Sequence, residues 1–361
     1  MVNGFFTSFF GPKRWIRKIG RRWKKVRRAK RKEAKEGEER ELIEKRKRFS
    51  SLFSEAIGPL DFSALTIVIP THERSGYLRR AIEFYEEWDC RVLIADSSAE
   101  RFSGEVPESF DYVHFPESPY GAKMKEIIGQ VATPYVLLAA DDDFISPFGA
   151  TSALEAISSD PEISSVQGWH SGFSRWKTAV NWSALHLFAK EYAIDGETPR
   201  QRIDQLTSLY LNNFYALHRT DVFSHFFGTV APELEDELQG RPDLFEIAQA
   251  VTTVHWGRHL VLPQLWIGRE MIADSEGFKS TTDWSDGDEG AQKLFQSLGS
   301  ILFPDTPEET LEQAYSKFVV YQNNWDGGEI PHGGNIEEVE SGKEDLTFRY
   351  RMEGLILKHM V

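Results

Sequence analysis

The fold is indicated most clearly by residues 135–143, whose sequence is YVLLAADDD. An uncharged, mostly apolar run is followed at once by three aspartates. An apolar run this short predicts a β-strand buried on both faces, as in parallel sheets covered by helices. Ligands of such sheets collect beyond the carboxyl ends of the strands, so the aspartates mark a candidate site.

Outward from this run, strand-like and helix-like stretches alternate along the chain. We expect strands at residues 65–69, 91–95, 112–115 and 135–140, and helices at 77–88 and 121–131. This alternation predicts an α/β fold of the Rossmann-like kind, with a mostly parallel sheet and flanking helices. Pro70, Asp96 and Asp141 follow three of these strands and are therefore predicted to meet at one edge of the sheet.

The second half of the chain has a less regular pattern. Residues 168–188 are rich in aromatic side chains and carry no clear period. The spacing beyond them predicts helices at 201–211 and 242–256, strands at 214–218 and 260–263, and a closing helix at 345–361.

The first 50 residues are strongly basic, with 19 Lys and Arg against 6 Asp and Glu, although the whole chain has a net charge of −14. An apolar stripe at helical spacing runs through this arm: Trp15, Ile16, Ile19, Trp23 and Val26. A helix of this kind suits an anionic membrane surface, which we expect residues 1–32 to bind. A solvated tail and nucleic-acid binding are the alternatives, and the acidic remainder disfavours nucleic acid.

Composition narrows the class of protein further. With 361 residues and 40% hydrophobic content, the chain can bury a large core. No apolar run approaches the ~20 residues that a membrane span needs. Cys90 is the single cysteine, which excludes an internal disulfide and a cysteine-built zinc site. A cytoplasmic protein, or one peripheral at the inner membrane face, fits these features.

The aspartate triplet has its own chemical requirement. Asp141, Asp142 and Asp143 repel one another when ionised, so a cation stabilises them together. Oxygen ligands with open positions suit Mn²⁺ or Mg²⁺, and such an ion would bridge to a diphosphate. We therefore predict these three residues as metal ligands, with a solvated loop that caps the next helix as the alternative.

Three motifs resemble the family 2 glycosyltransferases and related GT-A enzymes. Residues 65–74, LTIVIPTHER, with Tyr77-Leu78 after them, resemble the opening of that family. Residues 94–98, IADSS, resemble its second strand, and Asp142-Asp143 with Pro147 resembles its Asp-x-Asp motif. Two departures are His72-Glu73 in place of an aromatic-Asn pair and Ala95-Asp96-Ser97 in place of Asp-Asp-Gly.

The resemblance implies a GT-A fold and a role for each matching residue. Pro70, Thr71 and Asp96 would contact the nucleobase side, and Glu73 or Arg74 would line the nucleotide pocket. Lys123 or Lys125 would face the diphosphate, together with Asp141 and Asp142. The donor would be a UDP-, GDP- or dTDP-linked sugar. In this interpretation residues 61–168 form the donor half of the domain, 169–280 the acceptor half, 281–361 an extension, and 1–60 the arm.

The acceptor half supplies the candidate base. Residues 214–219, FYALHR, followed by residues 242–246, PDLFE, resemble the acceptor side of these enzymes. There Glu246, with Asp243 behind it, would deprotonate the hydroxyl of a glycan or lipid-linked acceptor. The alternatives are a nucleotidyltransferase with the same metal–phosphate geometry and a membrane-tethered binding protein without turnover. No Gly-rich phosphate loop follows the first strand, which disfavours the nucleotidyltransferase.

Overall fold

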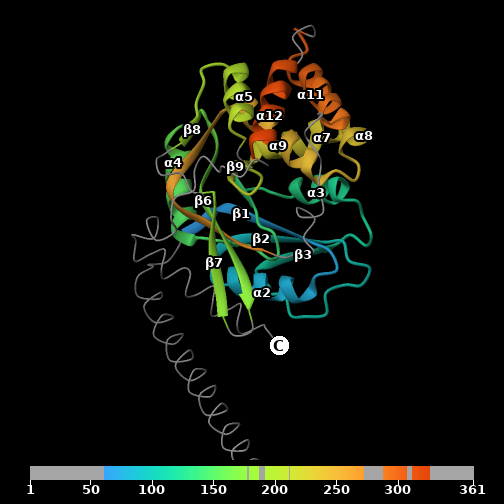
Figure 1. Cartoon of the computed structure of the whole chain (residues 1–361). Coiled ribbons are helices and arrows are strands. Elements are labelled where there is room, and N and C mark those ends of the chain that lie inside the picture. Colours follow the sequence, from blue (N-terminus) through green and yellow to red (C-terminus); the bar gives the residue numbers. More distant parts are fainter. Residues whose placement is uncertain are drawn as a thin grey trace, which may run out of the picture. The chain divides into compact units, whose positions relative to one another are not determined.

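The computed structural model describes most of the chain between residues 61 and 325 (Figure 1). The described residues are 61–176, 179–186, 192–210, 212–271, 288–306 and 311–325. The chain divides into two compact units, Met1–Ala56 and Ile57–Val361, and every described residue belongs to the second. The predicted basic arm and the predicted closing helix at 345–361 lie outside the described residues. In the described part, no helix is long and apolar enough to span a membrane.

The predicted parallel strands form one side of the sheet. Strand β1 (Asp61–Thr71) lies between β2 (Asp89–Asp96) and β4 (Tyr135–Leu138), and β3 (Phe110–His114) pairs with β2, all in parallel. The side chains of β1 pack into two separate hydrophobic cores: Val68 belongs to one core and its neighbour Ile67 to the other. Side chains alternate across a strand, so both faces of the sheet are covered. The α/β fold class is confirmed.

The sheet continues beyond β4 with strands of mixed direction. The neighbours in order are β9 (Leu217–Arg219), β6 (Ile163–Trp176), β10 (Arg258–Glu270) and β5 (Phe144–Ile145). β9 runs antiparallel to β4 and β6, whereas β6 and β10 run parallel. β7 (Ala179–His186) pairs with β6, and β8 (Tyr192–Ile194) pairs with β10. The predicted boundary between residues 168 and 169 falls inside β6, so the two predicted halves share one sheet.

Helices cover the sheet on both faces. On one face lie α2 (Ser75–Tyr85) and α4 (Pro147–Ser159), whose apolar residues share a core with Ile67. The other face is covered by α3 (Tyr120–Ile128), α9 (Pro242–Trp256), α11 (Glu289–Leu302) and α12 (Glu312–Trp325). Figure 1 shows α2 and α9 on opposite sides of β1 and β2. Shorter helical segments join them: α5 (Pro199–Ser208), α6 (Thr220–His225), the π-helical turn Phe226–Val230, α7 (Ala231–Glu233) and α8 (Glu235–Leu238).

The structure departs from the sequence prediction mainly in the second half. The strand expected at 214–218 begins only at Leu217, because Asn212 and Asn213 hold a turn: Phe214 N donates to Asn212 Oδ1 and Ala216 N to Asn213 O. The strand expected to end at Pro263 continues to Glu270 across an irregular register. Pro263 has no backbone N–H to donate to a neighbouring strand, and an irregularity in the pairing accommodates this loss.

Candidate functional site

The carboxyl ends of β1, β2 and β4 meet as the parallel topology requires. Thr71, the last residue of β1, is in register with Asp96, the last residue of β2. Its hydroxyl donates a 2.6 Å hydrogen bond to Asp141 Oδ2, just beyond β4. The structure thus brings together strand ends that are up to 70 residues apart in the sequence. Pro70, directly before this point, pairs in register with Ala95.

Arg74 supplies a positive charge to two of the three aspartates. It lies at the start of α2, and its guanidinium is 3.1 Å from Asp141 Oδ1 and 2.5 Å from Asp142 Oδ2. The guanidinium also stacks on the Tyr77 ring, 4.4 Å from its centroid. One third of the Arg74 side chain is exposed, with a relative accessibility of 33%, so this cation stands between the aspartates and solvent.

Asp143 faces a different partner. Its carboxylate accepts hydrogen bonds of 3.1 Å from Arg269 Nε and from the backbone N–H of Glu270, both at the end of β10. Behind this contact, the fully buried Arg80 forms an ion pair of 2.5 Å with Glu270. The carboxylates of the triplet therefore do not converge on one point, because the third is turned toward β10.

Burial shapes the protonation of this acidic loop. It raises the pKa of Asp141 to about 7, although the neighbouring Arg74 charge opposes the rise. Burial likewise raises the pKa of Asp143 to about 7, against the attraction of Arg269. A carboxylate whose pKa is raised in this way gains stability from an additional positive charge.

The fit of a divalent metal ion depends on Arg74. Within the residues that the structure describes, no group of three or more His, Cys, Asp and Glu side chains is placed to hold a metal ion. Asp141 and Asp142 nevertheless converge on one cation, for which the Arg74 guanidinium stands in. Two carboxylates completed by phosphate oxygens and water are a common Mg²⁺ environment. The pair fits such an ion once Arg74 moves aside, and Asp143 does not join it.

Asp96 is held by the residues around it. It accepts hydrogen bonds from Ser98 N (2.9 Å), Ser98 Oγ (2.6 Å) and the Tyr112 hydroxyl (2.6 Å). Burial raises the pKa of Asp96, but these hydrogen bonds outweigh it and the net pKa is below the usual value. A carboxylate offers about four lone-pair sites, so these three bonds leave one, and with Asp96 only 2% exposed a further donor must approach closely to reach it.

The two predicted diphosphate lysines have different positions on α3. Lys123 is buried, and its ammonium donates 2.8 Å hydrogen bonds to Thr71 O and Ser97 Oγ, which tie the end of β1 to the loop after β2. Burial lowers the pKa of Lys123 to about 8. Lys125 is exposed. Lys123 therefore supports the strand ends from inside, and the structure does not bring the two lysines together.

Glu73 fastens the same loop. Its backbone φ is +53°, a left-handed conformation uncommon outside glycine. Its N–H donates to Ser98 Oγ (2.7 Å), and its carboxylate accepts from Ala99 N (2.7 Å). These two bonds account for the unusual backbone, and they direct Glu73 to the loop after β2 rather than to Asp141.

Glu246 lies in the second turn of α9, in a partly buried environment. Its carboxylate accepts a hydrogen bond from the Asn212 side-chain amide. Burial raises the pKa of Glu246 to about 7; Asp243 adds to the rise, and Arg269 and Asn212 oppose it. Asp243 itself pairs with Arg241 at 2.8 Å, and Arg241 also reaches Asp288. Glu246 therefore exchanges a proton near neutral pH, whereas Asp243 is engaged in an ion pair.

Arg269 connects the two acidic regions. Its charge is close enough to both Asp143 and Glu246 to affect their pKa values, and its guanidinium lies 4.8 Å from the centroid of the Tyr215 ring. The predicted base and the aspartate loop therefore belong to one electrostatic neighbourhood. The sequence pointed to neither Arg269 nor Asn212, since each acts through contacts between segments distant in the chain and neither belongs to a recognisable motif.

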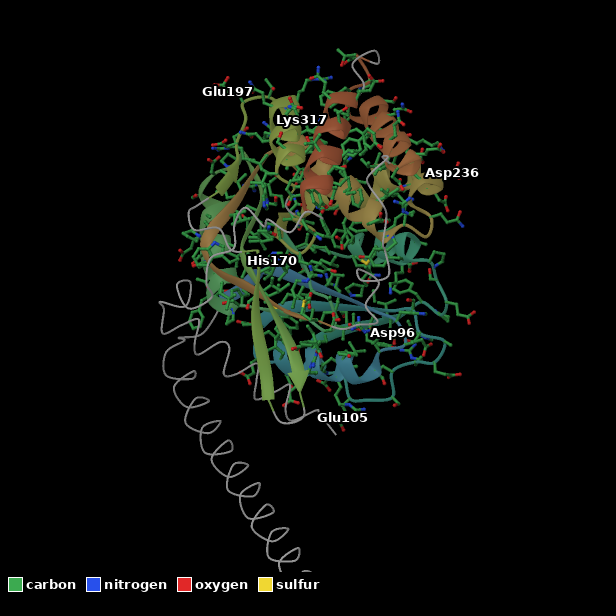
Figure 2. The ribbon with its side chains drawn as sticks, in the orientation of Figure 1. Asp96, Glu105, His170, Glu197, Asp236 and Lys317 are labelled. Carbon is green, nitrogen blue, oxygen red and sulfur yellow. The ribbon has the colours of Figure 1, made fainter. Side chains whose placement is uncertain are left out.

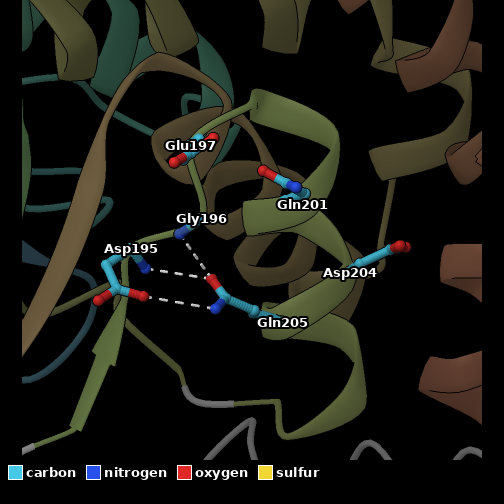
Figure 3. Close-up of a pocket in the computed structure, with 6 residues that line it drawn as sticks. All are labelled: Asp195, Gly196, Glu197, Gln201, Asp204 and Gln205. Carbon is cyan, nitrogen blue, oxygen red and sulfur yellow. Dashed lines mark hydrogen bonds between the residues drawn. The ribbon is translucent and has the colours of Figure 1, made fainter.

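A separate surface hollow surrounds the start of α5 (Figure 3). Its lining residues are Asp195, Gly196, Glu197, Gln201, Asp204 and Gln205. Gln205 Oε1 accepts from the backbone N–H groups of Asp195 (3.1 Å) and Gly196 (2.9 Å), so this side chain holds the preceding turn. Figure 2 shows Glu197 far from Asp96. None of the predicted site residues lines this hollow.

Comparisons with known proteins give distant structural matches only. Neither a protein-family model nor a curated protein matches the chain. The crystal structure of S. aureus TarS is similar over 82% of this chain and 54% of that chain, with 13% identity and a TM-score of 0.47. The chain thus spans about half of that TarS chain. TarS 1–349 in complex with UDP is similar over 82% of this chain and 89% of that chain, with 12% identity and a TM-score of 0.45. The complex with UDP-GlcNAc has the same coverages, 13% identity and a TM-score of 0.40.

Proposed function

We propose that this protein is a glycosyltransferase that transfers a sugar from a nucleotide-sugar donor to a glycan or lipid-linked acceptor. The observation that carries the proposal is the pairing of two unlike acidic regions through Arg269. One is a buried aspartate loop beyond the strand ends whose carboxylates pair with guanidinium groups, and the other is Glu246, whose carboxylate accepts a hydrogen bond from the neutral amide of Asn212. A donor diphosphate needs the first, and an acceptor hydroxyl needs the second.

The donor would lie over the ends of β1, β2 and β4. The remaining lone pair of Asp96 suits an N–H of the nucleobase, and the Arg74 guanidinium suits phosphate oxygens, which it can bind in a bidentate manner. Thr71 acts through Asp141, to which its hydroxyl is committed. A divalent ion bound at Asp141 and Asp142 would offset the charge that builds on the leaving diphosphate.

In the transfer step, the acceptor hydroxyl attacks the anomeric carbon and the bond to the diphosphate breaks. Glu246 takes the hydroxyl proton, which its raised pKa allows near neutral pH. Asn212 orients the Glu246 carboxylate through its amide hydrogen bond. Arg269 limits the rise in the pKa of Glu246, so that part of this residue stays ionised at pH 7.

Donor binding can be tested by a thermal-shift screen of UDP, GDP, CDP and dTDP, with and without Mn²⁺. A ligand at 100 times its Kd adds about 2.7 kcal/mol to the free energy of unfolding. We expect one nucleotide to raise the melting temperature of the wild type and to lose this effect in Asp142→Ala. Asp111→Ala, which changes an exposed carboxylate paired with Arg91, is the matched control. The proposal fails if no nucleotide shifts the melting temperature under any metal condition.

Turnover separates the enzyme from a binding protein. Water can take the place of the acceptor hydroxyl, so we expect slow release of nucleoside diphosphate from the matching sugar nucleotide even without an acceptor. Release of pyrophosphate from a nucleoside triphosphate and a sugar phosphate would instead identify a nucleotidyltransferase. Nucleotide binding without either product would favour the non-catalytic alternative.

The basic arm supports a second partner. We propose that residues 1–32 bind an anionic membrane surface, on the strength of their charge and apolar stripe. Co-sedimentation with phosphatidylserine vesicles should occur at low salt and weaken at 0.5 M NaCl. Binding to neutral vesicles that does not change with salt would contradict an electrostatic attachment.

A further inference from the structure

Arg74 occupies the position that a divalent cation would take. Its two terminal nitrogens contact Asp141 and Asp142 separately, so a single guanidinium bridges both carboxylates. A metal ion bound to the same two side chains would come into direct conflict with that guanidinium, both sterically and by charge repulsion.

The charges around the loop are already nearly balanced. Three guanidiniums, those of Arg74, Arg80 and Arg269, make ion pairs with four carboxylates, those of Asp141, Asp142, Asp143 and Glu270. Adding a divalent ion while all three guanidiniums stay in place would leave excess positive charge next to buried groups, which is unfavourable. A metal ion therefore requires either an arriving anion or the departure of one arginine.

Arg74 is the arginine of the three that is best placed to leave. Its side chain is 33% exposed, whereas that of Arg80 is 2% exposed and lies against the rings of Tyr77 and Phe144. The Arg269 side chain is almost as exposed as that of Arg74, at 30%, but its ion pair is with Asp143, outside the Asp141–Asp142 pair, and it lies against the Tyr215 ring. The Arg74 guanidinium also stacks on a ring, that of Tyr77, but it alone of the three forms ion pairs with both Asp141 and Asp142, and its partial exposure lets it rotate toward solvent or toward a bound anion.

We propose that Arg74 and a divalent cation compete for the Asp141–Asp142 pair, and that a nucleotide diphosphate resolves the competition by giving the guanidinium phosphate oxygens to bind. Metal then loads together with the nucleotide and only weakly without it. The competition follows from the ion pairs alone, whereas its resolution by a diphosphate rests on the proposed function.

The competition is tested by titrating Mn²⁺ into nucleotide-free protein and measuring free Mn²⁺ by electron paramagnetic resonance. Arg74 contacts both carboxylates and would repel a divalent ion beside it, so its removal should tighten Mn²⁺ binding about tenfold. The variants are Arg74→Gln and the control Arg79→Gln, which removes the same charge from an exposed position on α2. Arg79→Gln should bind Mn²⁺ as the wild type does. Equal Mn²⁺ affinity in Arg74→Gln and the wild type would overturn the proposal.

Two further measurements keep the test decisive. Arg74→Lys retains the charge without the two-pronged geometry and should bind Mn²⁺ with intermediate affinity; melting curves in EDTA confirm that each variant is folded.

For the nucleotide that binds the wild type, Arg74→Gln should lose affinity even though its metal affinity has risen. If Mn²⁺ affinity rises in Arg74→Gln but no nucleotide binds any form, the competition stands and the proposed function fails. If nucleotides bind but Arg74→Gln gains no Mn²⁺ affinity, the proposed function stands and the competition is wrong.

Discussion

The aspartate loop after β4 and Glu246 on α9 are two acidic regions with opposite kinds of partner. Asp141, Asp142 and Asp143 each pair with a guanidinium, whereas Glu246 accepts a hydrogen bond from the neutral amide of Asn212. Burial nevertheless raises the pKa of Glu246, and those of Asp141 and Asp143, to about 7.

This difference separates two tasks of a carboxylate. A carboxylate next to a partly exposed cation such as Arg74 can exchange that cation for another, which suits binding of a metal and a diphosphate. A carboxylate next to a neutral amide has its proton as the exchangeable partner, which suits a general base. In the proposed function the neighbours of each region, rather than its residue type, would set its task, and substitutions at each should have distinct effects.

The largest effect is expected for Glu246→Gln. A general base contributes roughly 10²–10⁴-fold to rate, so the transfer rate should fall by about this factor while donor affinity stays unchanged. Asp243→Asn on the same helix is the comparison: it removes the Arg241 ion pair and lowers the pKa of Glu246 but keeps Glu246 as a base, so it should affect mainly stability and change the rate little. Steady-state kinetics with the identified donor and acceptor provide the measurement. Equal loss of rate in both variants would remove Glu246 from its assigned role.

Removing the charge of Arg269, which lies between the two acidic regions, should mainly lower the free energy of unfolding. Arg269→Gln leaves the buried Asp143 carboxylate with the Glu270 N–H as its remaining hydrogen-bond donor among the described residues, which should lower the free energy of unfolding by about 2–3 kcal/mol at pH 8. The folded-state pKa of Asp143 is already raised to about 7 and would rise further, so the deficit should shrink as pH falls and Asp143 becomes protonated. Urea denaturation at pH 8 and pH 5 measures this. A deficit that does not change with pH would show that Asp143 is not its source.

Asn212→Ala should shift the pH dependence of turnover. The Asn212 hydrogen bond lowers the pKa of Glu246, so its loss should move the rising limb of the rate profile upward by about one pH unit. Since less Glu246 would then be ionised, the rate at pH 7 should fall up to about tenfold and recover toward pH 9. Loss of rate by the same factor at every pH would instead mean that Asn212 only maintains the local structure.

The smallest effect concerns the cost of keeping Glu246 ionised. Its folded-state pKa of about 7 is above the usual value of 4.5, so its ionised form destabilises the fold at high pH and not at low pH. Glu246→Gln should therefore melt at a higher temperature than the wild type at pH 8, and the difference should vanish below about pH 4.5. Scanning calorimetry at the two pH values measures the change. A lower melting temperature of the variant at pH 8 would contradict the assigned burial cost.

The sequence predicted the first half of the sheet well because its signal is local. The uncharged runs before Pro70, Asp96 and Asp141 form parallel strands, and their ends meet as predicted. Helix α9 also has the expected bounds, Pro242–Trp256. In the second half, β6 was missed because its buried positions include polar side chains such as Ser165, Gln167 and His170, which hide the apolar pattern.

For the candidate site, the sequence named several of the residues that the structure brings together, but it did not show how their side chains are oriented. The sequence identified Pro70, Asp96 and Asp141 because strand ends of a parallel sheet share an edge, whereas Thr71 was implied only by the family resemblance. It could not show that Asp143 turns toward Arg269, since β10 lies more than a hundred residues away. Nor could it show that Lys123 points inward, because burial of an ammonium depends on the acceptors Thr71 O and Ser97 Oγ of other segments.

The most direct test of the two-region account is one set of nucleotide affinities. Isothermal titration of the nucleotide identified by thermal shift, in the presence of Mn²⁺, should be carried out on the wild type, Asp142→Ala and Glu246→Gln. The account predicts that Asp142→Ala binds about 100-fold more weakly, or about 2.7 kcal/mol, and that Glu246→Gln binds as the wild type does. Equal weakening in both variants, or wild-type affinity in Asp142→Ala, would contradict the division of the site into a donor loop and an acceptor base.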